Sequence, residues 1–340
     1  MGINMWWNIG FLVSLNLIIQ IISGVLLTFF FSPSWIDSFL GIMIFYRWQQ
    51  WGWVVQLIHF NNASIVFFLL FVHLFRGLVI FRFIKLFKVW NLGVLIFFLI
   101  MMEAFLGYVL PWGQISLWGA TVITNFISAF PLIGDKMLIW VRSNFIIDKD
   151  SLYRFFSLHY FIPLFILIFI VLHLLFLHLE GSSNQINSKI NLDKIRLFPF
   201  FLRKDFFFFF FRIIFFFRII LISPHALGDT ENFISGDYEK TPDKIQPEWY
   251  FLFSYAILRS FPEKLSGILA MILSVAIFFL LTLKFFNDFL IFSINKKILV
   301  WLFIFSLIIL IIEGSNHASE DTVLFRGVFS ALYFSSLLLI

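Results

Sequence analysis

The 340-residue sequence contains no cysteine. The chain therefore has no disulfides, no thiolate metal sites and no thioether link to a covalent haem. Charged residues are also scarce: they make up 13% of the sequence, whereas soluble domains carry about a quarter. With 61% hydrophobic residues and a mean hydropathy of +0.98, the composition excludes a soluble globular enzyme and indicates an integral membrane protein.

Hydrophobic runs of about 20 residues, the length that a helix needs to cross a bilayer, recur along the chain. We predict eight transmembrane helices, at 9–31, 54–80, 90–110, 157–179, 206–222, 265–284, 296–312 and 323–340. Helices are favoured because a spanning segment must satisfy its backbone hydrogen bonds internally, and the alternating pattern of a barrel is absent. The first run is too long and starts too late for a cleavable signal peptide. The predicted fold class is an all-α integral membrane protein.

Three connections, 112–156, 180–205 and 223–264, are long and polar enough to form structure outside the membrane core. The segment after the first span mixes aromatic residues with few charges, which is typical of an interfacial helix. Basic residues gather in the loops on one side, which the positive-inside rule assigns to the cytoplasm or matrix. The 53 phenylalanines indicate a T-rich coding sequence, as an organelle genome would have.

Four histidines lie within the predicted spans as two pairs with one spacing. His59 and His73 are 14 residues apart, and so are His159 and His173. Fourteen residues advance a helix by about 21 Å and return to within roughly 40° of the same face. Two such helices offer imidazoles at two membrane levels, which is what two bis-histidine haems need. For any one histidine, pairing with another polar group is the alternative, but the shared spacing favours haem.

Glycines repeat this interval on two other predicted helices, at Gly10 and Gly24 and at Gly93 and Gly107. A glycine in a membrane helix permits close approach, usually of another helix. The match with the histidine interval instead favours a flat macrocycle against each backbone. Arg76 follows the second histidine of the first pair by three residues and is a candidate partner for a haem propionate. Its alternative role is a positive-inside anchor.

These paired histidines, together with "GYVLPWGQISLWGATVITN" at 107–125 and "PEWYFLFSYAILRS" at 247–260, resemble cytochrome b of the respiratory bc complex, complex III. The resemblance implies a haem-binding bundle of the first four helices with surface helices in 1–205. It places the remaining helices and the PEWY loop in 206–340. It implies that His59 and His159 ligate the iron of a low-potential b haem, and that His73 and His173 ligate a high-potential one. The glycines at 10, 24, 93 and 107 match haem-packing positions, and residue 76 matches a propionate partner.

The family oxidises quinol on the positive side and reduces quinone on the matrix side, with proton translocation. The resemblance therefore implies a catalytic subunit of ubiquinol–cytochrome c oxidoreductase. The implied quinol oxidation site consists of Tyr108, Trp118, Gly119, Ile123, Pro247, Glu248, Phe251 and Tyr255. The implied quinone reduction site consists of Trp7, His178, Ser182, Lys204 and Asp205. The expected catalytic residues are Glu248 and Tyr255 at the first site and His178 and Asp205 at the second.

The expected cofactors are two b-type haems, with ubiquinone and ubiquinol as substrates. The expected partners are the Rieske iron–sulfur protein, a membrane-anchored c-type cytochrome, other complex III subunits, lipids and a second copy of the complex, but no nucleic acid. The expected location is the mitochondrial inner membrane, with the bacterial plasma membrane as the alternative. Four residues depart from the family pattern or interrupt a span: Gln56, Glu103, Arg212 and Arg218.

Two other functions fit parts of this pattern. A di-haem membrane anchor of a dehydrogenase would exchange electrons with quinone at one site, but it needs no PEWY segment and usually has fewer than eight spans. A transporter or channel would line a polar path with histidine and arginine. Such a protein predicts broken helices or inverted repeats, and the sequence has no such repeat.

Overall fold

The computed structural model describes the chain except for residues 1–7, 182–195, 284–293 and 318–319. The described residues form helices and no strand. Seven helices are long and apolar enough to cross a membrane: α1 (Ile9–Thr28), α3 (Gly52–Val79), α5 (Phe87–Val109), α8 (Lys149–Glu180), α11 (Lys264–Leu283), α12 (Ile294–Gly314) and α13 (Glu320–Leu339). Each of them coincides with a predicted span, so the protein is a multi-pass membrane protein.

The remaining predicted span, 206–222, forms helix α9 (Leu202–Ile222). This helix carries five charged side chains, which is why it falls outside the seven most apolar helices: Arg203, Lys204, Asp205, Arg212 and Arg218. The predicted interfacial segment contains helix α2 (Trp35–Trp48).

Helix α8 begins eight residues before the predicted start of its span. Asp148 precedes the helix, and its Oδ1 accepts hydrogen bonds from the backbone amides of Asp150 and Ser151 at 3.1 and 3.3 Å. These contacts satisfy amides that the first turn of a helix leaves without partners. The first turn is charged, so hydropathy alone placed the start too late.

The chain forms two compact units, which are described separately. The first unit comprises residues 1–31, 41–80 and 180–229, and the second comprises 32–40, 81–179 and 230–340. These units do not correspond to the predicted domains 1–205 and 206–340, because each unit contains residues from both of them. The domain boundary at residue 205 stays a prediction.

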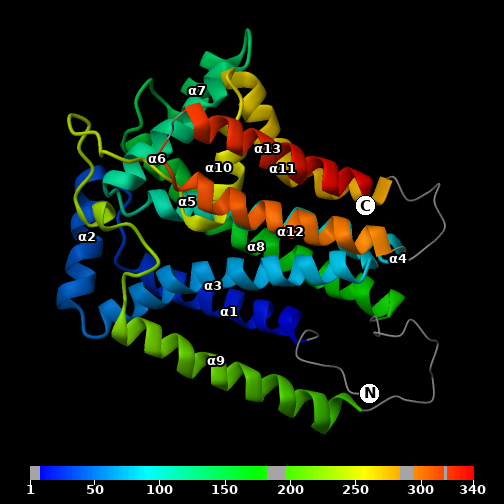
Figure 1. Cartoon of the computed structure of the whole chain (residues 1–340). Coiled ribbons are helices and arrows are strands. Elements are labelled where there is room, and N and C mark those ends of the chain that lie inside the picture. Colours follow the sequence, from blue (N-terminus) through cyan, green and yellow to red (C-terminus); the bar gives the residue numbers. More distant parts are fainter. Residues whose placement is uncertain (1–7, 182–195, 284–293, 318–319) are drawn as a thin grey trace. The chain divides into compact units, whose positions relative to one another are not determined.

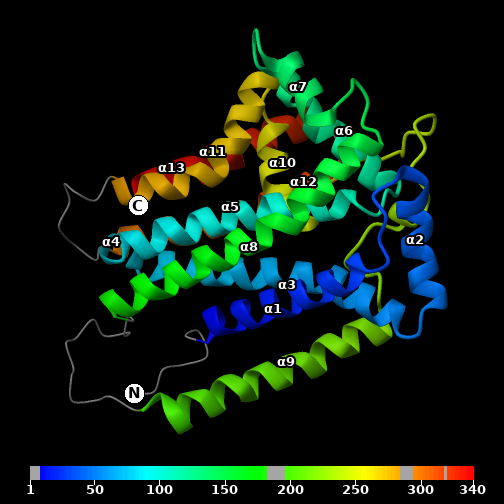
Figure 2. The same ribbon diagram turned by 180° about the vertical axis from the view of Figure 1, so that it is seen from behind.

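In the first unit α1, α3 and α9 lie side by side (Figures 1 and 2). Asn62 of α3 is buried, and its Nδ2 donates to the Asn16 carbonyl and to Gln20 Oε1 of α1, both at 2.9 Å. Leu57 of α3 packs with Phe216 and Ile220 of α9. Polar interhelical bonds and apolar packing thus fix α3 against both neighbours.

In the second unit, the short helix α10 (Leu252–Leu258) packs against α11, α12 and α13. Phe303 and Tyr333 are fully buried beside it, with ring centroids 5.1 Å apart. The Tyr333 hydroxyl donates to the Ser274 carbonyl of α11 at 2.7 Å. Helix α5 joins the same group, because the Trp90 indole N–H donates to the Phe278 carbonyl at 2.8 Å.

The predicted extramembrane connection 112–156 contains α6 (Gln114–Asn125), the 3₁₀ turn η2 (Ile127–Ala129) and α7 (Gly134–Arg142). The connection 223–264 contains η4 (Thr230–Phe233), η5 (Trp249–Phe251) and α10. The two connections meet within the second unit, where Gly113 and Ser235 form an isolated bridge. Shorter elements are α4 (Arg82–Lys85) and the π-helical turn η3 (Leu197–Phe201).

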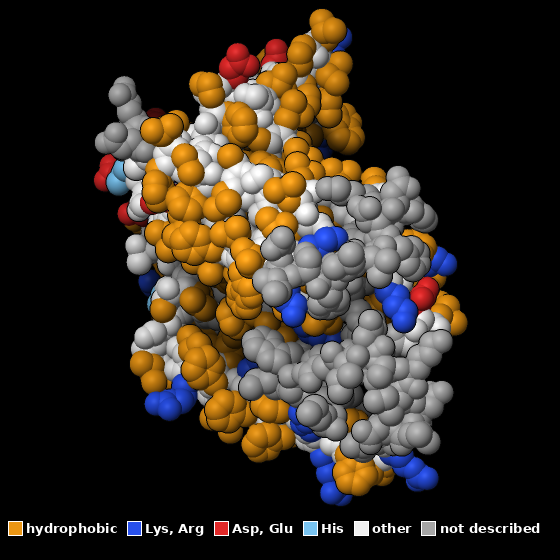
Figure 3. Space-filling view, turned by 45° about the vertical axis from the view of Figure 1, so that its right-hand side comes forward, with side chains coloured by type: hydrophobic (Ala, Val, Ile, Leu, Met, Phe, Trp, Pro, Cys, Tyr) orange, Lys and Arg blue, Asp and Glu red, His pale blue; other side chains and the backbone are white. Residues whose placement is uncertain are grey.

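Hydrophobic side chains, drawn in orange, cover much of the surface in Figure 3. On α8, for example, Val171 is 65% and Ile168 is 57% exposed. A soluble protein seldom exposes apolar side chains on this scale, whereas lipid-facing helices require it.

Candidate functional site

In the first unit, each histidine of α3 faces a glycine of α1. A Cβ built on Gly24 would lie 3.0 Å from Cε1 of His59, and one built on Gly10 would lie 3.3 Å from Cε1 of His73. The equal spacing of the two pairs therefore brings the helices together at two levels. Glycine is needed here because the imidazole occupies the space that a side chain would fill.

The second unit repeats this arrangement with α5 and α8. A Cβ built on Gly93 would lie 3.2 Å from Cε1 of His173, and one built on Gly107 would lie 2.5 Å from Cε1 of His159. The interval of 14 residues thus serves one purpose in both units: it pairs each glycine with a histidine of the neighbouring helix.

The Nδ1 atoms of two of these histidines have identified acceptors. His59 Nδ1 lies 3.0 Å from Ser23 Oγ, whose own proton goes to the Ile19 carbonyl at 2.7 Å. His159 Nδ1 lies 2.7 Å from Glu103 Oε1 and 3.1 Å from the Glu103 carbonyl oxygen. Since these neighbours accept hydrogen bonds, each Nδ1 carries the proton and Nε2 keeps its lone pair.

This donor set fits a haem. A metal-bound histidine commonly donates its other ring N–H to a carbonyl or carboxylate, which fixes the tautomer and the ring orientation. The macrocycle supplies four ligands to its iron, so that each haem needs only two imidazoles. Among the described residues, no group of three or more histidine, aspartate or glutamate side chains is arranged to hold a metal ion on its own.

The predicted propionate partner, Arg76, is half-buried in the last turn of α3, one turn after His73. Gln56, which precedes His59 by three residues, is also half-buried on α3. Both lie on the helix that carries the first histidine pair.

The eight residues predicted for quinol oxidation all belong to the second unit and come from four elements. They lie at the end of α5, on α6, around η5 and on α10, and each is half-buried: Tyr108, Trp118, Gly119, Ile123, Pro247, Glu248, Phe251 and Tyr255. The side chains between them, such as Leu117 and Ile257, are fully buried. The predicted residues are therefore more accessible than these neighbours in the sequence.

Several contacts hold these elements in place. Ser116 Oγ on α6 donates to the Tyr108 carbonyl at 2.6 Å, and the Trp118 indole N–H donates to the Asp237 carbonyl at 3.3 Å. Tyr255 Oη lies 3.5 Å from the Ile245 carbonyl, just before the PEWY segment. A Cβ on Gly119 would meet no atom within 4 Å, which leaves open space beside α6.

Glu248 immediately precedes η5, in an extended conformation with φ −55° and ψ 151°. Pro247 before it restricts the approach of the chain. Burial, together with the nearby Glu248 carboxylate, raises the pKa of Tyr250 well above its usual range. The Tyr250 phenol therefore stays neutral, and Glu248 is the acidic group of the PEWY segment.

Arg142, at the end of α7, is hydrogen-bonded to α6, which carries part of the predicted site. It is 3% exposed, and its guanidinium donates to Thr124 Oγ1 at 2.7 Å, the Thr121 carbonyl at 2.8 Å and Asn125 Oδ1 at 2.9 Å. It also donates to the Phe145 carbonyl at 2.8 Å. Sequence patterns did not predict that Arg142 supports α6.

The residues predicted for quinone reduction are only partly described. Trp7 and Ser182 lie outside the described residues. His178 is exposed near the end of α8 in the second unit, and Lys204 and Asp205 are half-buried in the first turn of α9 in the first unit. This site stays a prediction.

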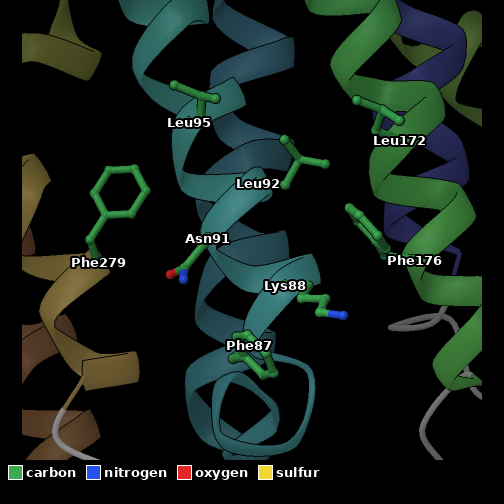
Figure 4. A pocket seen from close by; sticks show the side chains of 8 residues that line it. All are labelled: Phe87, Lys88, Asn91, Leu92, Leu95, Leu172, Phe176 and Phe279. Carbon is green, nitrogen blue, oxygen red and sulfur yellow. The ribbon is translucent and has the colours of Figure 1, made fainter.

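A cavity of about 430 Å³ lies in the second unit and was not predicted. Figure 4 shows its lining side chains on α5, with Leu172 and Phe176 on α8 and Phe279 on α11. Lys88 and Asn91 are its polar members, and the rest of the lining is apolar. Such a lining suits a hydrocarbon chain better than a polar substrate.

Comparisons with known proteins agree with this geometry. A family model described as "Cytochrome b/b6/petB" matches residues 1–181, and one described as "Cytochrome b(C-terminal)/b6/petD" matches residues 235–334. A solved structure described as "Hyperthermophilic respiratory Complex III" is similar, with a TM-score of 0.92 and 26% sequence identity. The alignment covers 99% of this chain and 91% of that one.

Proposed function

Because this chain belongs to the cytochrome b/b6 family and is an electron-transfer subunit of a bc-type respiratory complex, we propose that it oxidises ubiquinol at one site and reduces ubiquinone at another. The observation that carries this proposal is the glycine–histidine pairing, which recurs at one interval on α1 and α3 and on α5 and α8. Two levels of imidazoles suit an electron path across a membrane, whereas a transporter needs no such repeat.

The four histidines would hold two b-type haems through Nε2, His59 with His159 and His73 with His173, as the family resemblance implies. When bound, the haems supply a one-electron path across the bilayer. Ser23 and Glu103 orient the imidazoles of His59 and His159 by accepting their Nδ1 protons. The glycines at 10, 24, 93 and 107 keep the helix surface free of side chains at each imidazole.

At the quinol site the chain's own residues would position the substrate and take its protons. Glu248 is the proton acceptor, because it is a half-buried carboxylate in the PEWY segment and a carboxylate within hydrogen-bond reach can take a proton from a bound quinol. Tyr255 would position the quinol ring, and Trp118 would form a wall held by the Asp237 carbonyl. At the opposite side His178 and Asp205 would supply protons to the quinone, with Lys204 as a relay and with Trp7 and Ser182 in the lining.

The proposed partners are those that the family resemblance implies: a Rieske iron–sulfur protein takes one electron of each quinol, and a membrane-anchored c-type cytochrome accepts it in turn. Other complex III subunits, lipids and a second copy of the complex complete the proposed assembly. We place the protein in the mitochondrial inner membrane, a proposal supported by its 53 phenylalanines, with the bacterial plasma membrane as the alternative. Cell fractionation with an antibody against the chain would distinguish the two.

The substitution Glu248→Gln tests the quinol site. It removes the proton acceptor and keeps the size of the side chain, so quinol oxidation should slow by about 100-fold or more, as is usual for general bases. Both haem spectra should stay intact, because Glu248 lies in the PEWY segment, outside the helices α3 and α8 that carry the four histidines. The matched control is Glu263→Gln, which removes an exposed carboxylate and should leave the rate unchanged.

Loss of haem absorbance in Glu248→Gln would make the PEWY segment a structural element and contradict its assignment to the quinol site. Inhibitor binding distinguishes this function from that of a di-haem anchor, because the proposal requires two quinone sites that can be blocked separately. Wild-type protein without b-type absorption bands would refute the proposal as a whole.

A further inference from the structure

Glu103 is a carboxylate within the membrane-spanning helix α5, and its side chain is only 15% exposed. Its Oε1 lies 2.7 Å from Nδ1 of His159. Its Oε2 is buried and has no hydrogen-bond partner in the part of the chain that the structure describes. A carboxylate in such a place is costly unless a specific partner compensates it, so it marks a functional contact by default.

The contact has a defined direction. Both the Glu103 side chain and its own carbonyl oxygen, 3.1 Å from the ring nitrogen, face Nδ1 of His159. Both are acceptors, so Nδ1 donates its proton and Nε2 is left to bind iron. The carboxylate thus contacts the ring nitrogen opposite the one that would bind the metal.

His59 is supported by a neutral group, the Ser23 hydroxyl at 3.0 Å, and the Val89 backbone is the polar neighbour of His173. Val89 precedes Gly93 by four residues, as Glu103 precedes Gly107, so the two positions are equivalent along α5. At this equivalent position the chain places a charged side chain beside His159 in addition to the backbone carbonyl.

We propose that Glu103 is a positioning residue for the haem held by His159 and that it lowers the reduction potential of this haem. The inference rests on the proposed function, since it requires a haem at that histidine. A charge-assisted hydrogen bond to Nδ1–H makes the imidazole a more basic ligand. A more basic ligand stabilises the oxidised iron, which bears the greater positive charge, and second-shell hydrogen bonding is one of the ways in which proteins tune haem.

A lowered reduction potential of this haem favours the proposed direction of electron transfer. The low-potential haem must pass its electron readily to the other haem, and a lower potential makes that transfer more favourable. Because the carboxylate is buried, its influence is screened less than that of a surface charge. Glu103 therefore favours transfer away from the level of His159 and toward the level of His173.

The experiment is a redox titration of the membrane-bound complex carrying Glu103→Gln. The amide keeps an oxygen acceptor for Nδ1–H but removes the charge. The potential of one b-type component should rise by on the order of 59 mV, a tenfold change in the reduction equilibrium, while the other component stays unchanged. The g values of the oxidised low-spin haem should shift for the same component only.

Two further variants complete the test. Glu103→Ala removes the side chain but leaves the carbonyl oxygen of residue 103 as a neutral acceptor, so it should raise the same potential. Asp135→Asn removes an exposed carboxylate from α7 and should change neither potential. This control separates a local effect of Glu103 from a change in net charge.

Unchanged potentials in both Glu103 variants, with two haems retained, would refute the inference and leave the proposed function intact. Loss of the haem in both variants would also overturn it, because Glu103 would then be required for structure rather than for tuning. If wild-type protein lacks two separable b-type components, the proposed function fails first, and the two failures are thereby distinguished.

Discussion

The most direct perturbation of the haem sites is the addition of one methyl group at Gly107. In Gly107→Ala, the new Cβ would lie 2.5 Å from Cε1, 3.0 Å from Nε2 and 3.1 Å from Nδ1 of His159. Carbon atoms in good contact lie about 3.5–4.0 Å apart, so the ring must retreat by about 1 Å. It cannot do so freely, because its Nδ1 is held by Glu103 on the same helix as Gly107.

A movement of this size is large for a metal ligand, because ligand distances tolerate about 0.2 Å. Overpacking of this kind costs about 1–3 kcal/mol, which corresponds to roughly fivefold to 150-fold weaker haem binding. We therefore expect Gly107→Ala to lose most of the haem ligated by His159. The haem of the other level should remain.

Haem content per chain, measured from the reduced-minus-oxidised spectrum, tests this expectation. The four alanine substitutions should rank by the predicted contact distance, with Gly107 at 2.5 Å the most damaging, followed by Gly24 at 3.0 Å, Gly93 at 3.2 Å and Gly10 at 3.3 Å. The control is Gly327→Ala on α13, where a Cβ meets nothing within 4 Å. Full haem content in Gly107→Ala, or a greater loss in Gly10→Ala, would refute the reasoning.

Three other predictions follow from contacts elsewhere. Arg142→Met should lower the free energy of unfolding by on the order of 3 kcal/mol, because it leaves buried hydrogen-bond acceptors of α6 unpaired. It should also weaken quinol oxidation. Thermal loss of haem absorbance measures the change in stability. Asn62→Leu should lower the free energy of unfolding by less, about 0.6–1.7 kcal/mol, because interhelical hydrogen bonds in membranes are weak. A loss of stability equal to that of Arg142→Met would contradict this expectation. Burial and the nearby Asp148 carboxylate raise the pKa of Tyr238 to about 12. The pKa of Tyr238 in the folded protein lies above the usual 10.0. The neutral phenol therefore contributes its full share to the free energy of unfolding below pH 10, and this share is lost as the pH rises through 12. Thermal scans between pH 9 and 12 should show this decline in the wild type and a flatter profile in Tyr238→Phe.

The sequence predicted the spans well because hydropathy and helix length depend on local composition. The start of α8 was the main error among the spans: its first turn is charged, and its start depends on a cap at Asp148 that a hydropathy window does not detect. The quinol site stays a prediction from its motifs. The structure adds how the elements that carry these motifs are held together, for example by the hydrogen bond from Trp118 to the Asp237 carbonyl, 119 residues away.

The sequence by itself determined which residues share a helix face, because a helix repeats its geometry at fixed intervals and His59 and His73 must return to one side. It also determined that glycines on two helices match that interval. Only the tertiary structure decided what the four glycines at 10, 24, 93 and 107 face, and which groups accept the Nδ1 protons of His59 and His159. Those partners lie on other helices, Ser23 being 36 residues from His59 and Glu103 being 56 from His159. No local rule relates residues at such separations, because packing of one helix on another brings them together.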